Sequence, residues 1–496
     1  MATGGTVQVD VAELGAKLES IVGPGRVSTS RAVCRAYSYS AFWGRTWLTV
    51  PDLVVVAATA EEVSQVLRVA NEAGVPATPK GPVGQGGFGG PMKGGILLDL
   101  TPMDEITVDR KNMKVIAGAG GSFFRLAQEL FKHRLMLPTS EYGPGPTVAS
   151  SAIFPVNAFG KTRYGRNIDL VEGFEVVLPD GQIVRVGSMA YADSDFGPYY
   201  RYITGPDLVG LFTQSNGAFG IVTKVAYSCL RLPKCWAFHA YYWPLAQAET
   251  FAAVMTEATA MEIFDIHISD RWRFVGLEKA GLIPPLPNDC NFVAYLTVNA
   301  ESPAELAAKE DVIHEMCRSR GGTYLPGAAD HFYAEWPTVF AVVSQPMLVK
   351  LFNLTREASG ATGMMICDSL NYPTSWFPQV YDKLMKTARK YGLWGEPNMI
   401  VYDGFPMKSL TICSQTWLFI DFYDRDWMRR VEAYRAEFRE WFGARGGTHQ
   451  SGVPPYPEYS WGNQPGAHDL LRRIKGLLDP NDILSPGTFE KRDWSR

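Results

Sequence analysis

The sequence is poor in cysteine and in long apolar runs. Its 7 cysteines are scattered over 496 residues without a C-x-x-C pair, which argues against a disulfide framework and against a zinc or iron–sulfur centre. No stretch reaches the roughly eighteen apolar residues of a membrane span, and the start lacks the basic and apolar regions of a signal peptide. We therefore expect a cytoplasmic protein with no membrane partner.

An excess of charge of either sign is also missing. Lys and Arg number 47 against 51 Asp and Glu, which gives a net charge of −4. No strong field therefore favours nucleic acid or an anionic surface. Apolar residues make up 46% and charged residues 20%, as in ordinary globular proteins. The expected partner is a small-molecule substrate, and no nucleic acid is expected.

The first clear pattern is a β-α-β unit. The apolar run 53–58 predicts a strand, and the capping pair Thr59 and Glu62 predicts the start of a helix. Gly74 predicts the end of that helix, and a second strand is expected over 75–79.

Glycines are concentrated in the stretch 79–100, which holds 8 of them between two predicted strands. Glycine permits positive φ and lets backbone N–H groups approach a ligand, so this stretch predicts a phosphate cradle, with a flexible linker as the alternative. Gly84, Gly86 and Gly89 match G-x-G-x-x-G, but Pro91 and a strand follow where a dinucleotide-binding motif needs a helix. A Rossmann fold is therefore not expected.

A second cluster of small residues lies within 138–184 and ends in a predicted hairpin at Asp180 and Gly181. A further small-residue turn precedes the apolar strand that begins near Gly220. Two small-residue loops and a hairpin between apolar strands predict an α+β domain in which the backbone approaches a flat or anionic ligand.

The second half of the sequence contains two similar segments. The strand pattern 291–299 is followed by a helical pattern and RGGTYLPG at 320–327, and the pattern 416–424 is followed by a helix and RGGTHQSG at 445–452. Residues 236–258 resemble a weaker third copy. We expect a mixed β/α domain of duplicated units, with chance similarity of a shared turn as the alternative.

Four motifs, arriving in this order, resemble the vanillyl-alcohol oxidase and para-cresol methylhydroxylase (PCMH) superfamily of flavoproteins. They are GQGGFGGP (84–91), PTVASSAIFPVNAFGKTRYGRNIDLVEGFEVVLPDG (146–181), GLFTQSNGAFGIVTK (210–224) and DPNDILSPG (479–487). The resemblance implies an α+β fold, with a PCMH-type FAD-binding domain of two α/β subdomains and a mixed β/α cap domain around the substrate. The expected divisions are an N-terminal extension (1–49), the FAD-binding domain (50–235), the cap domain (236–440) and a C-terminal segment returning to the flavin site (441–496).

The same resemblance implies which residues hold FAD. The glycine loop would hold the pyrophosphate, the second loop would line the flavin, and residues from a later strand and the tail would complete the site. A turn or packing role is the alternative for each of them. The implied FAD-binding residues are Lys80, Gly81, Gly84, Gln85, Gly86, Gly87, Phe88, Gly89, Thr147, Val148, Ser150, Ser151, Tyr164, Gly165, Asn167, Gly220, Ile221, Val222 and Asn481.

The sequence departs from the phenol-oxidising members of the superfamily. They carry a Tyr in the glycine loop and a Tyr-Arg pair near the C-terminus, where this chain has Phe88 and, near the pair, Gly446 and Gly447. A phenolate without donors carries a desolvation cost on the order of several kcal/mol, so an alkylphenol is not the expected substrate.

Two further departures concern FAD attachment and metal. Segment 411–423 lacks the His that covalent members use, so the FAD is expected to be non-covalent. The H-x-G-D-G-N-x-H motif of related D-2-hydroxy-acid dehydrogenases is missing, and no two histidines have close metal-ligand spacing. No metal is expected.

Hydride transfer to a flavin requires one base to take the proton of the substrate hydroxyl. Glu141, just before the second loop, and His449, after the second Arg-Gly-Gly-Thr, are the candidate bases, each with a structural role as its alternative. Tyr142 is a further candidate catalytic residue, at the pocket wall together with Phe88.

We therefore expect an FAD-dependent dehydrogenase or oxidase that oxidises a small, aromatic or apolar alcohol or activated alkyl carbon. One alternative is a 2-hydroxy-acid dehydrogenase, which needs a cationic carboxylate clamp from Arg163, Arg166 or Arg271. Another is a flavoprotein electron-relay subunit of a larger complex. The electron acceptor is left open, and a homodimer or an electron-accepting subunit is the expected protein partner.

Overall fold

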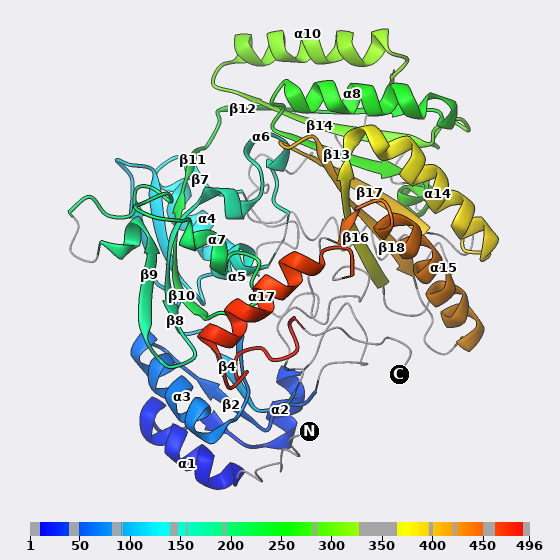
Figure 1. Ribbon diagram of the computed structural model, residues 1–496. Helices are drawn as coiled ribbons and strands as arrows, with labels where there is room; N and C mark the ends of the chain where they lie inside the picture. Colours follow the sequence, from blue (N-terminus) through cyan, green and yellow to red (C-terminus); the bar gives the residue numbers. More distant parts are fainter. Residues whose placement is uncertain are drawn as a thin grey trace.

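Three large β-sheets organise the part of the chain that the structure describes (Figure 1). The computed structural model describes residues 10–38, 49–81, 91, 93–138, 147–154, 157–191, 195–279, 281, 285–326, 365–395, 400–419, 424–449 and 462–489. Two of the sheets share one hydrophobic core, and the third has its own core together with the helices that cover it.

The first sheet has the strand order β1-β2-β4-β3, with β2 and β3 both parallel to β4. The predicted helix signals are confirmed, because the Thr59 side chain accepts from the Glu62 N–H and Gly74 has a φ of +63°. Part of the predicted N-terminal extension belongs to this layer, since β1 pairs with β2 and α1 packs on α3. The elements are α1 (Val11–Val22), β1 (Val27–Ser28), α2 (Arg31–Tyr37), β2 (Leu53–Val56), α3 (Ala60–Ala73), β3 (Ala77–Lys80) and β4 (Ile96–Asp99).

The second sheet is antiparallel, in the order β5-β6-β10-β8-β9. The hairpin predicted at Asp180 and Gly181 joins β8 to β9, and Gly181 has a φ of +83°. β7 and β11 pair with each other in a separate two-stranded sheet. The elements of this part of the chain are β5 (Ile106–Asp109), β6 (Lys114–Gly118), α4 (Phe123–Phe131), β7 (Leu135–Met136), α5 (Val148–Ile153), α6 (Lys161–Tyr164), β8 (Val171–Val177), β9 (Ile183–Gly187), α7 (Leu208–Phe212), β10 (Ile221–Ser228) and β11 (Leu230–Arg231).

The third sheet, here called the cap sheet, has eight strands in the order β15-β12-β14-β13-β17-β18-β16-β19. Helices α8, α10, α14 and α15 cover its outer face (Figure 1). The elements are β12 (Cys235–Trp243), α8 (Ala248–Ala260), β13 (Asp265–Asp270), α9 (Val275–Lys279), β14 (Phe292–Ala300), α10 (Pro303–Ser319), β15 (Thr323–Tyr324), β16 (Met365–Pro373), α14 (Phe377–Lys390), β17 (Ile400–Met407), β18 (Thr411–Phe419), α15 (Arg425–Gly443) and β19 (Thr448–His449).

The two similar segments in the second half of the sequence correspond to a structural duplication. Each unit runs strand, helix, strand, strand, helix, strand, with the short helix α9 added between the two middle strands of the first unit. The short strands of the two Arg-Gly-Gly-Thr motifs, β15 and β19, lie at opposite edges of the cap sheet. Residues 236–258 form β12 and α8, so they open the first unit instead of making a third copy. The sequence pattern did not show where the first unit begins, because the Arg-Gly-Gly-Thr motif marks only the end of each unit.

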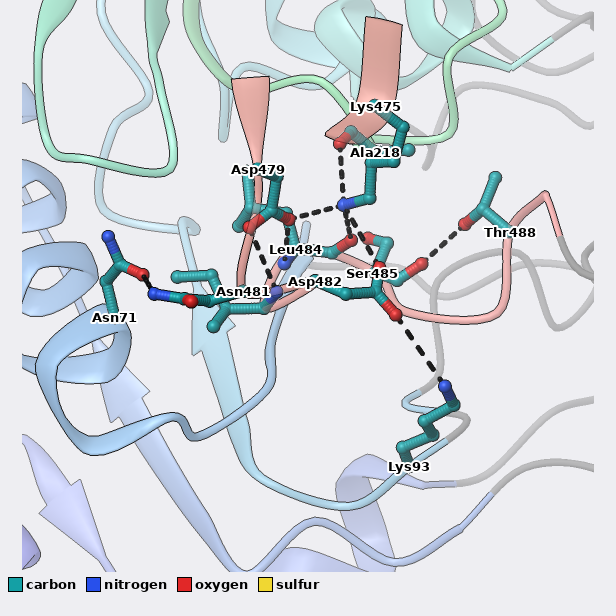
Figure 2. Close-up of polar contacts among 11 residues, drawn as sticks. Asn71, Lys93, Ala218, Lys475, Asp479, Asn481, Asp482, Leu484, Ser485 and Thr488 are labelled. Carbon is teal, nitrogen blue, oxygen red and sulfur yellow. Dashed lines mark hydrogen bonds and ion pairs between the residues drawn. The ribbon is translucent and has the colours of Figure 1, made fainter. Parts of the chain in front are cut away.

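The C-terminal helix α17 (Pro465–Leu478) runs between the two lobes of the molecule, one formed by the first two sheets and the other by the cap sheet with its helices (Figure 1). The tail after α17 packs on the first sheet. The buried Lys475 ammonium donates to the carbonyl oxygens of Ala218 at 3.0 Å and Leu484 at 2.8 Å, and it pairs with Asp479 (Figure 2). The Ala77 N–H of β3 donates to Ile483 O at 2.7 Å. The tail is therefore held beside the strand that leads into the glycine loop.

Candidate active site

The two predicted flavin loops meet where β3 ends. A Cβ placed on Gly81 would lie 2.8 Å from Thr147 Cγ2, so only glycine lets the first loop start this close to the second. Thr147 is held in turn by a bridge to Ser122, and the Val148 N–H donates to Gly121 O at 2.8 Å. The predicted residues Gly84, Gln85, Gly86, Gly87, Phe88 and Gly89 lie outside the described residues.

Lys80 places a half-buried ammonium at the entrance to the glycine loop. Its Nζ donates to the Tyr37 carbonyl and lies 5.4 Å from the centre of the Tyr37 ring. Burial lowers the pKa of Lys80, and the nearby Asp99 opposes that shift. A partly desolvated ammonium attracts anions more strongly than an exposed one, so Lys80 suits the phosphate side of a nucleotide.

The second loop is backed by buried polar side chains. Asn167 Nδ2 donates to Ser151 Oγ at 3.4 Å, and the Tyr227 hydroxyl donates to Val148 O at 2.9 Å. Asn167 is fully buried, yet its Oδ1 has no hydrogen-bond partner among the described residues. A buried amide oxygen without a donor is costly. The ring N–H and ribityl hydroxyls of a flavin are donors of the missing kind, so the residues present fit FAD.

Other predicted FAD residues occupy packing positions. The Tyr164 ring meets Phe264 edge-on at 6.1 Å, so it packs on the cap-sheet side. A Cβ on Gly220 would lie 2.4 Å from Val176 Cγ1, and Ile221 and Val222 pair with β8. These glycine and strand positions are required by packing whether or not they also approach FAD.

Gly165 and Asn481 have local partners. Gly165 has a φ of +82°, and a Cβ there would lie 2.2 Å from Asp169 Oδ2. The exposed Asn481 donates to Asn71 Oδ1 at 2.7 Å, at the end of α3 (Figure 2). Ser150 donates its hydroxyl to Thr147 O at 2.7 Å, which stabilises the start of α5.

The face of the cap sheet opposite its helices, here called the inner face, is buried and mostly polar. Side chains alternate between the faces of a strand, and on β13 the apolar Ile266 and Ile268 belong to the helix-covered core. The inner face therefore receives the other residues of these strands. They include Asp265, His267, Ser269, Ser369, Asn371, Asp403, Phe405, Cys413, Gln415 and Trp417.

The segment that follows the second flavin loop, 157–166, lies across this inner face. Lys161 Nζ contacts both Asp265 carboxylate oxygens at 2.9 and 3.0 Å, and both side chains are almost fully buried. Asn157 Nδ2 donates to Cys413 Sγ at 3.2 Å, at the middle of the sheet. We call 157–166 the bridging segment, because it connects the second flavin loop to the cap sheet.

The predicted catalytic residues cannot be placed as side chains. Glu141 and Tyr142 lie outside the described residues. The backbone of His449 is in the edge strand β19, where it pairs with Leu370, and its side chain is not described. Their assignment stays a prediction.

The three arginines that could bind a substrate carboxylate differ in their hydrogen-bond partners. Arg271 donates to Pro287 O at 2.7 Å and lies 3.9 Å from Glu278, and Arg163 donates to Asn299 at 3.3 Å. The Arg166 side chain donates to the neutral Asn371 at 3.1 Å, and its buried Nε has no partner among the described residues. Arg166 is therefore the candidate whose guanidinium group has hydrogen-bond donors without partners among the described residues.

Gly446 and Gly447, near the expected phenolate-binding pair, line a cavity of about 660 Å³ against the segment 210–219 and α17. The described residues that line it include amide and hydroxyl side chains such as Gln214, Asn463 and Thr448, but no Lys or Arg. The cationic contact that a phenolate requires is therefore missing from this part of the cavity wall.

Sequence reasoning missed the inner face. The buried strand Asp265–Asp270 reads D-I-H-I-S-D, in which apolar and polar residues alternate. A strand with one face in a hydrophobic core and polar residues on a second, buried face is a signal of a ligand-facing surface, and that signal was available.

Neither a metal centre nor a membrane span is found in the part of the chain that the structure describes. No group of three or more His, Cys, Asp or Glu residues there is arranged to hold a metal ion. No helix among the described elements is both long and apolar enough to cross a membrane.

Two family models match this chain. The model for an FAD binding domain matches residues 51–187, and the model for the C-terminal domain of FAD linked oxidases matches residues 245–489. The crystal structure of p-cresol methylhydroxylase with substrate bound superposes with a TM-score of 0.83, at 17% identity and 99% coverage of both chains. The chain is therefore an FAD-linked oxidoreductase with the fold of p-cresol methylhydroxylase. The PCMH-type fold and FAD as the cofactor are thereby confirmed.

Two curated relatives of this FAD-linked oxidoreductase match along most of its length. A D-lactate dehydrogenase of Anaerostipes hadrus is 25% identical over 458 residues, which cover 88% of this chain and 89% of that protein. The glycolate oxidase subunit GlcD of Bacillus subtilis (strain 168) is 24% identical over 498 residues, with 96% coverage of each. The enzyme class is therefore an FAD-linked dehydrogenase or oxidase, and at these identities the substrate stays open.

Proposed function

We propose that this FAD-linked oxidoreductase oxidises a small, uncharged aromatic or apolar alcohol to the corresponding carbonyl compound. The observation that supports this most is the inner face of the cap sheet. Phe405, Met407 and Cys413 form a small apolar cluster there, next to buried polar side chains. Bound FAD would accept the hydride of the carbinol carbon. The chain's own residues bind the alcohol, exclude water and take the hydroxyl proton.

The charges on the inner face favour an uncharged substrate. Asp265 and Asp403 are both buried there, and Lys161 neutralises Asp265. A substrate carboxylate placed beside the Asp403 carboxylate would meet like charge in a site of low dielectric constant. An alcohol avoids this cost and offers a hydroxyl that can donate to the site.

A 2-hydroxy acid is the second candidate substrate, and Arg166 is the observation that favours it. Its guanidinium has a single hydrogen bond, to a neutral amide, and a buried Nε without a partner among the described residues. Carboxylates pair with such a group through charge-assisted hydrogen bonds. The names of the two curated relatives, a D-lactate dehydrogenase and a glycolate oxidase subunit, agree with this candidate.

The two candidates use different parts of the inner face. Arg166 contacts β16, which is separated from β13 by the strands β17 and β18. Three strand spacings of about 4.8 Å place these backbones about 14 Å apart. A two- or three-carbon acid held by Arg166 therefore does not reach residues on β13, whereas an alcohol over Phe405 does.

The electron acceptor after FAD is proposed to be a separate protein or carrier. The relative named as a glycolate oxidase subunit supports an assembly in which the flavoprotein passes electrons on. A purely electron-relaying role, without a substrate of its own, is the third candidate. Non-covalent attachment of FAD stays part of the proposal, since it rests on the lack of a His in 411–423.

The test is anaerobic bleaching of the purified flavoprotein by benzylic alcohols, alkylphenols and 2-hydroxy acids, after acid precipitation has shown whether the flavin is released. We expect release of the flavin and bleaching by a benzylic alcohol, with Arg166→Met and the matched control Arg163→Met equally active.

Bleaching by a 2-hydroxy acid, with a KM about 100-fold higher in Arg166→Met but not in Arg163→Met, would support the second candidate instead. Bleaching by no alcohol or acid, together with electron transfer between added carriers, would support the relay role.

A further inference from the structure

A row of buried polar residues crosses the middle of the inner face. Ser269 on β13 pairs with Asp403 on β17, Asp403 pairs with Gln415 on β18, and Gln415 pairs with Ser369 on β16. Their side chains are 1%, 1%, 2% and 1% exposed in the order Ser269, Asp403, Gln415 and Ser369. Polar groups in the interior of a sheet stabilise it less than apolar ones, so a continuous row indicates a chemical role.

Asp403 is the centre of this row. Its Oδ1 accepts from Ser269 Oγ at 2.6 Å, and its Oδ2 accepts from Trp417 Nε1 at 2.8 Å. Two neutral donors from different strands therefore fix the orientation of the carboxylate. His267 Nε2 lies 3.3 Å from the same Oδ1.

His267 is more accessible than the carboxylate behind it. The His267 side chain is 12% exposed and that of Asp403 is 1% exposed. The imidazole lies against Phe405, with ring centres 4.7 Å apart, and Tyr295 flanks it at 6.1 Å. An imidazole at the accessible end of a fixed, buried carboxylate is the arrangement in which a base is oriented by a third group.

We propose that His267 is the base that removes the proton of the substrate hydroxyl, and that Asp403 is its positioning residue. This rests on the proposed alcohol oxidation. With Nε2–H donating to Asp403, the lone pair on Nδ1 takes the hydroxyl proton. The O–H and the carbinol C–H bonds break, a C=O double bond forms, and the hydride leaves with two electrons to FAD. The alcohol is oxidised and the flavin reduced.

Charged and titratable groups face His267 from the described elements β13, β14, β17 and α6. Asp403 faces it from β17, Tyr295 from β14, and Asp265 lies on the same strand with Lys161 of α6 paired to it. The Lys161 ammonium lies 4.7 Å from the centre of the Phe405 ring. Lys161 and Asp265 pair with each other, and Asp403 is the carboxylate that contacts the imidazole.

The proposal differs from the sequence-based assignment of His449. The backbone of His449 is in the edge strand β19, and the strands β17, β18 and β16 separate it from β13. Substitutions at His267 and His449 therefore test two separate places on the cap sheet. Ser269→Ala is the control within the network, because it removes one donor to Asp403 and the 3.4 Å contact of Ser269 Oγ with His267 Nε2, while the imidazole and the carboxylate both stay.

The experiment follows flavin reduction by the most active alcohol under anaerobic stopped flow, over pH 5 to 10, in the holoenzyme and four variants. We expect His267→Gln to lower the reduction rate by about 10²- to 10⁴-fold, with little change in substrate affinity and a flattened pH profile. Ser269→Ala and His449→Gln should lose about tenfold or less. The flavin absorption spectrum and melting temperature of each variant show whether it is folded and loaded.

Asp403→Asn separates a positioning role from a structural one. Loss of the carboxylate should lower the apparent pKa of the base by about one to three units, so the acid limb of the rate profile moves to lower pH. A side-chain NMR titration of the histidines in the full chain should show the same fall for the signal that His267→Gln deletes. This readout does not depend on turnover.

Two failures are distinguishable. If no alcohol bleaches the wild-type flavin, the proposed function is wrong, and the inference falls with it. If the wild type is bleached while His267→Gln keeps its rate and pH profile, the function stands and the inference is overturned. An unshifted histidine pKa in Asp403→Asn would overturn the positioning role alone.

Discussion

Asp265 and Asp270 begin and end the same strand, β13, on opposite faces of the cap sheet, and both are buried. On the inner face, Asp265 is ion-paired with Lys161 of the bridging segment. On the helix-covered face, Asp270 has the Tyr381 hydroxyl at 3.4 Å, and its Oδ1 has no partner among the described residues. Desolvation, followed by repulsion from Asp403, raises the pKa of Asp270 well above its ordinary value.

The comparison shows two ways to bury a carboxyl group. A charge is tolerated where an oppositely charged group is brought to it, and otherwise the proton stays on. The inner face receives its cation from the FAD-binding part of the chain, so the pair also joins the two lobes. On the helix-covered face, α15 brings Arg435 and Arg439 to the buried Asp368, but no described cation pairs with Asp270, and burial raises the pKa of its carboxyl group.

The largest expected effect comes from removing the cation that pairs with Asp265, because Asp265 would then be buried without a cation, as Asp270 is among the described residues. Lys161→Met leaves a buried carboxylate without its cation, which should lower the free energy of unfolding by about 3 to 5 kcal/mol. Chemical denaturation of the holoenzyme measures the loss. Lys161→Met combined with Asp265→Leu should regain most of it, and a double variant as unstable as the single one would contradict the ion-pair explanation.

A second prediction concerns Asp270. Because its folded-state pKa is raised, the folded protein holds the proton more tightly than the unfolded chain. The contribution to stability is therefore complete below about pH 4 and is lost as the pH rises toward the folded pKa, at about 1.4 kcal/mol per unit. Asp270→Asn removes this dependence, so its stability relative to the wild type should rise with pH above about 4.

Denaturation curves at several pH values, compared between Asp270→Asn and the wild type, isolate this contribution. The comparison cancels the titration of other groups, such as Glu437, whose hydrogen bonds with Lys383 and Lys390 lower its pKa to about 2. A stability difference that does not change with pH would show that Asp270 is ionised in the fold.

The smallest expected effect concerns a third buried polar group, Asn167, whose Oδ1 has no hydrogen-bond donor among the described residues. We predict that FAD satisfies it. Asn167→Ala should weaken FAD binding about five- to tenfold, or about 1 to 1.4 kcal/mol. Fluorescence titration of the apoprotein measures the affinity. The melting temperature of the apoprotein should fall only slightly, because the variant loses one long hydrogen bond, from Asn167 Nδ2 to Ser151 Oγ at 3.4 Å; a large fall would indicate a structural role.

Much of the fold was predictable from local patterns. Thr59 and Gly74 delimit α3 through their side chain and positive φ, and Asp180 and Gly181 make the hairpin of the second sheet, because caps and turns depend on few neighbouring residues. The FAD assignment was also predictable, since its motifs are contiguous in sequence. The pairing of Gly81 with Thr147 follows from two such motifs, although their contact appears only in the fold.

The candidate site was less predictable because it is assembled from strands far apart in the chain. His267 and Asp403 are 136 residues apart and meet only because β17 pairs with β13. Their separation in sequence hides a contact that a single strand register creates.

The sequence by itself determined the FAD-binding architecture, the duplicated cap and the departures from phenol oxidation, because these depend on residue types at fixed local spacing. The tertiary structure decided which polar faces of the cap strands are buried, which arginine has hydrogen-bond donors without partners among the described residues, and which histidine contacts a buried carboxylate. Those choices depend on burial and on contacts between distant strands, and residue order alone does not specify either.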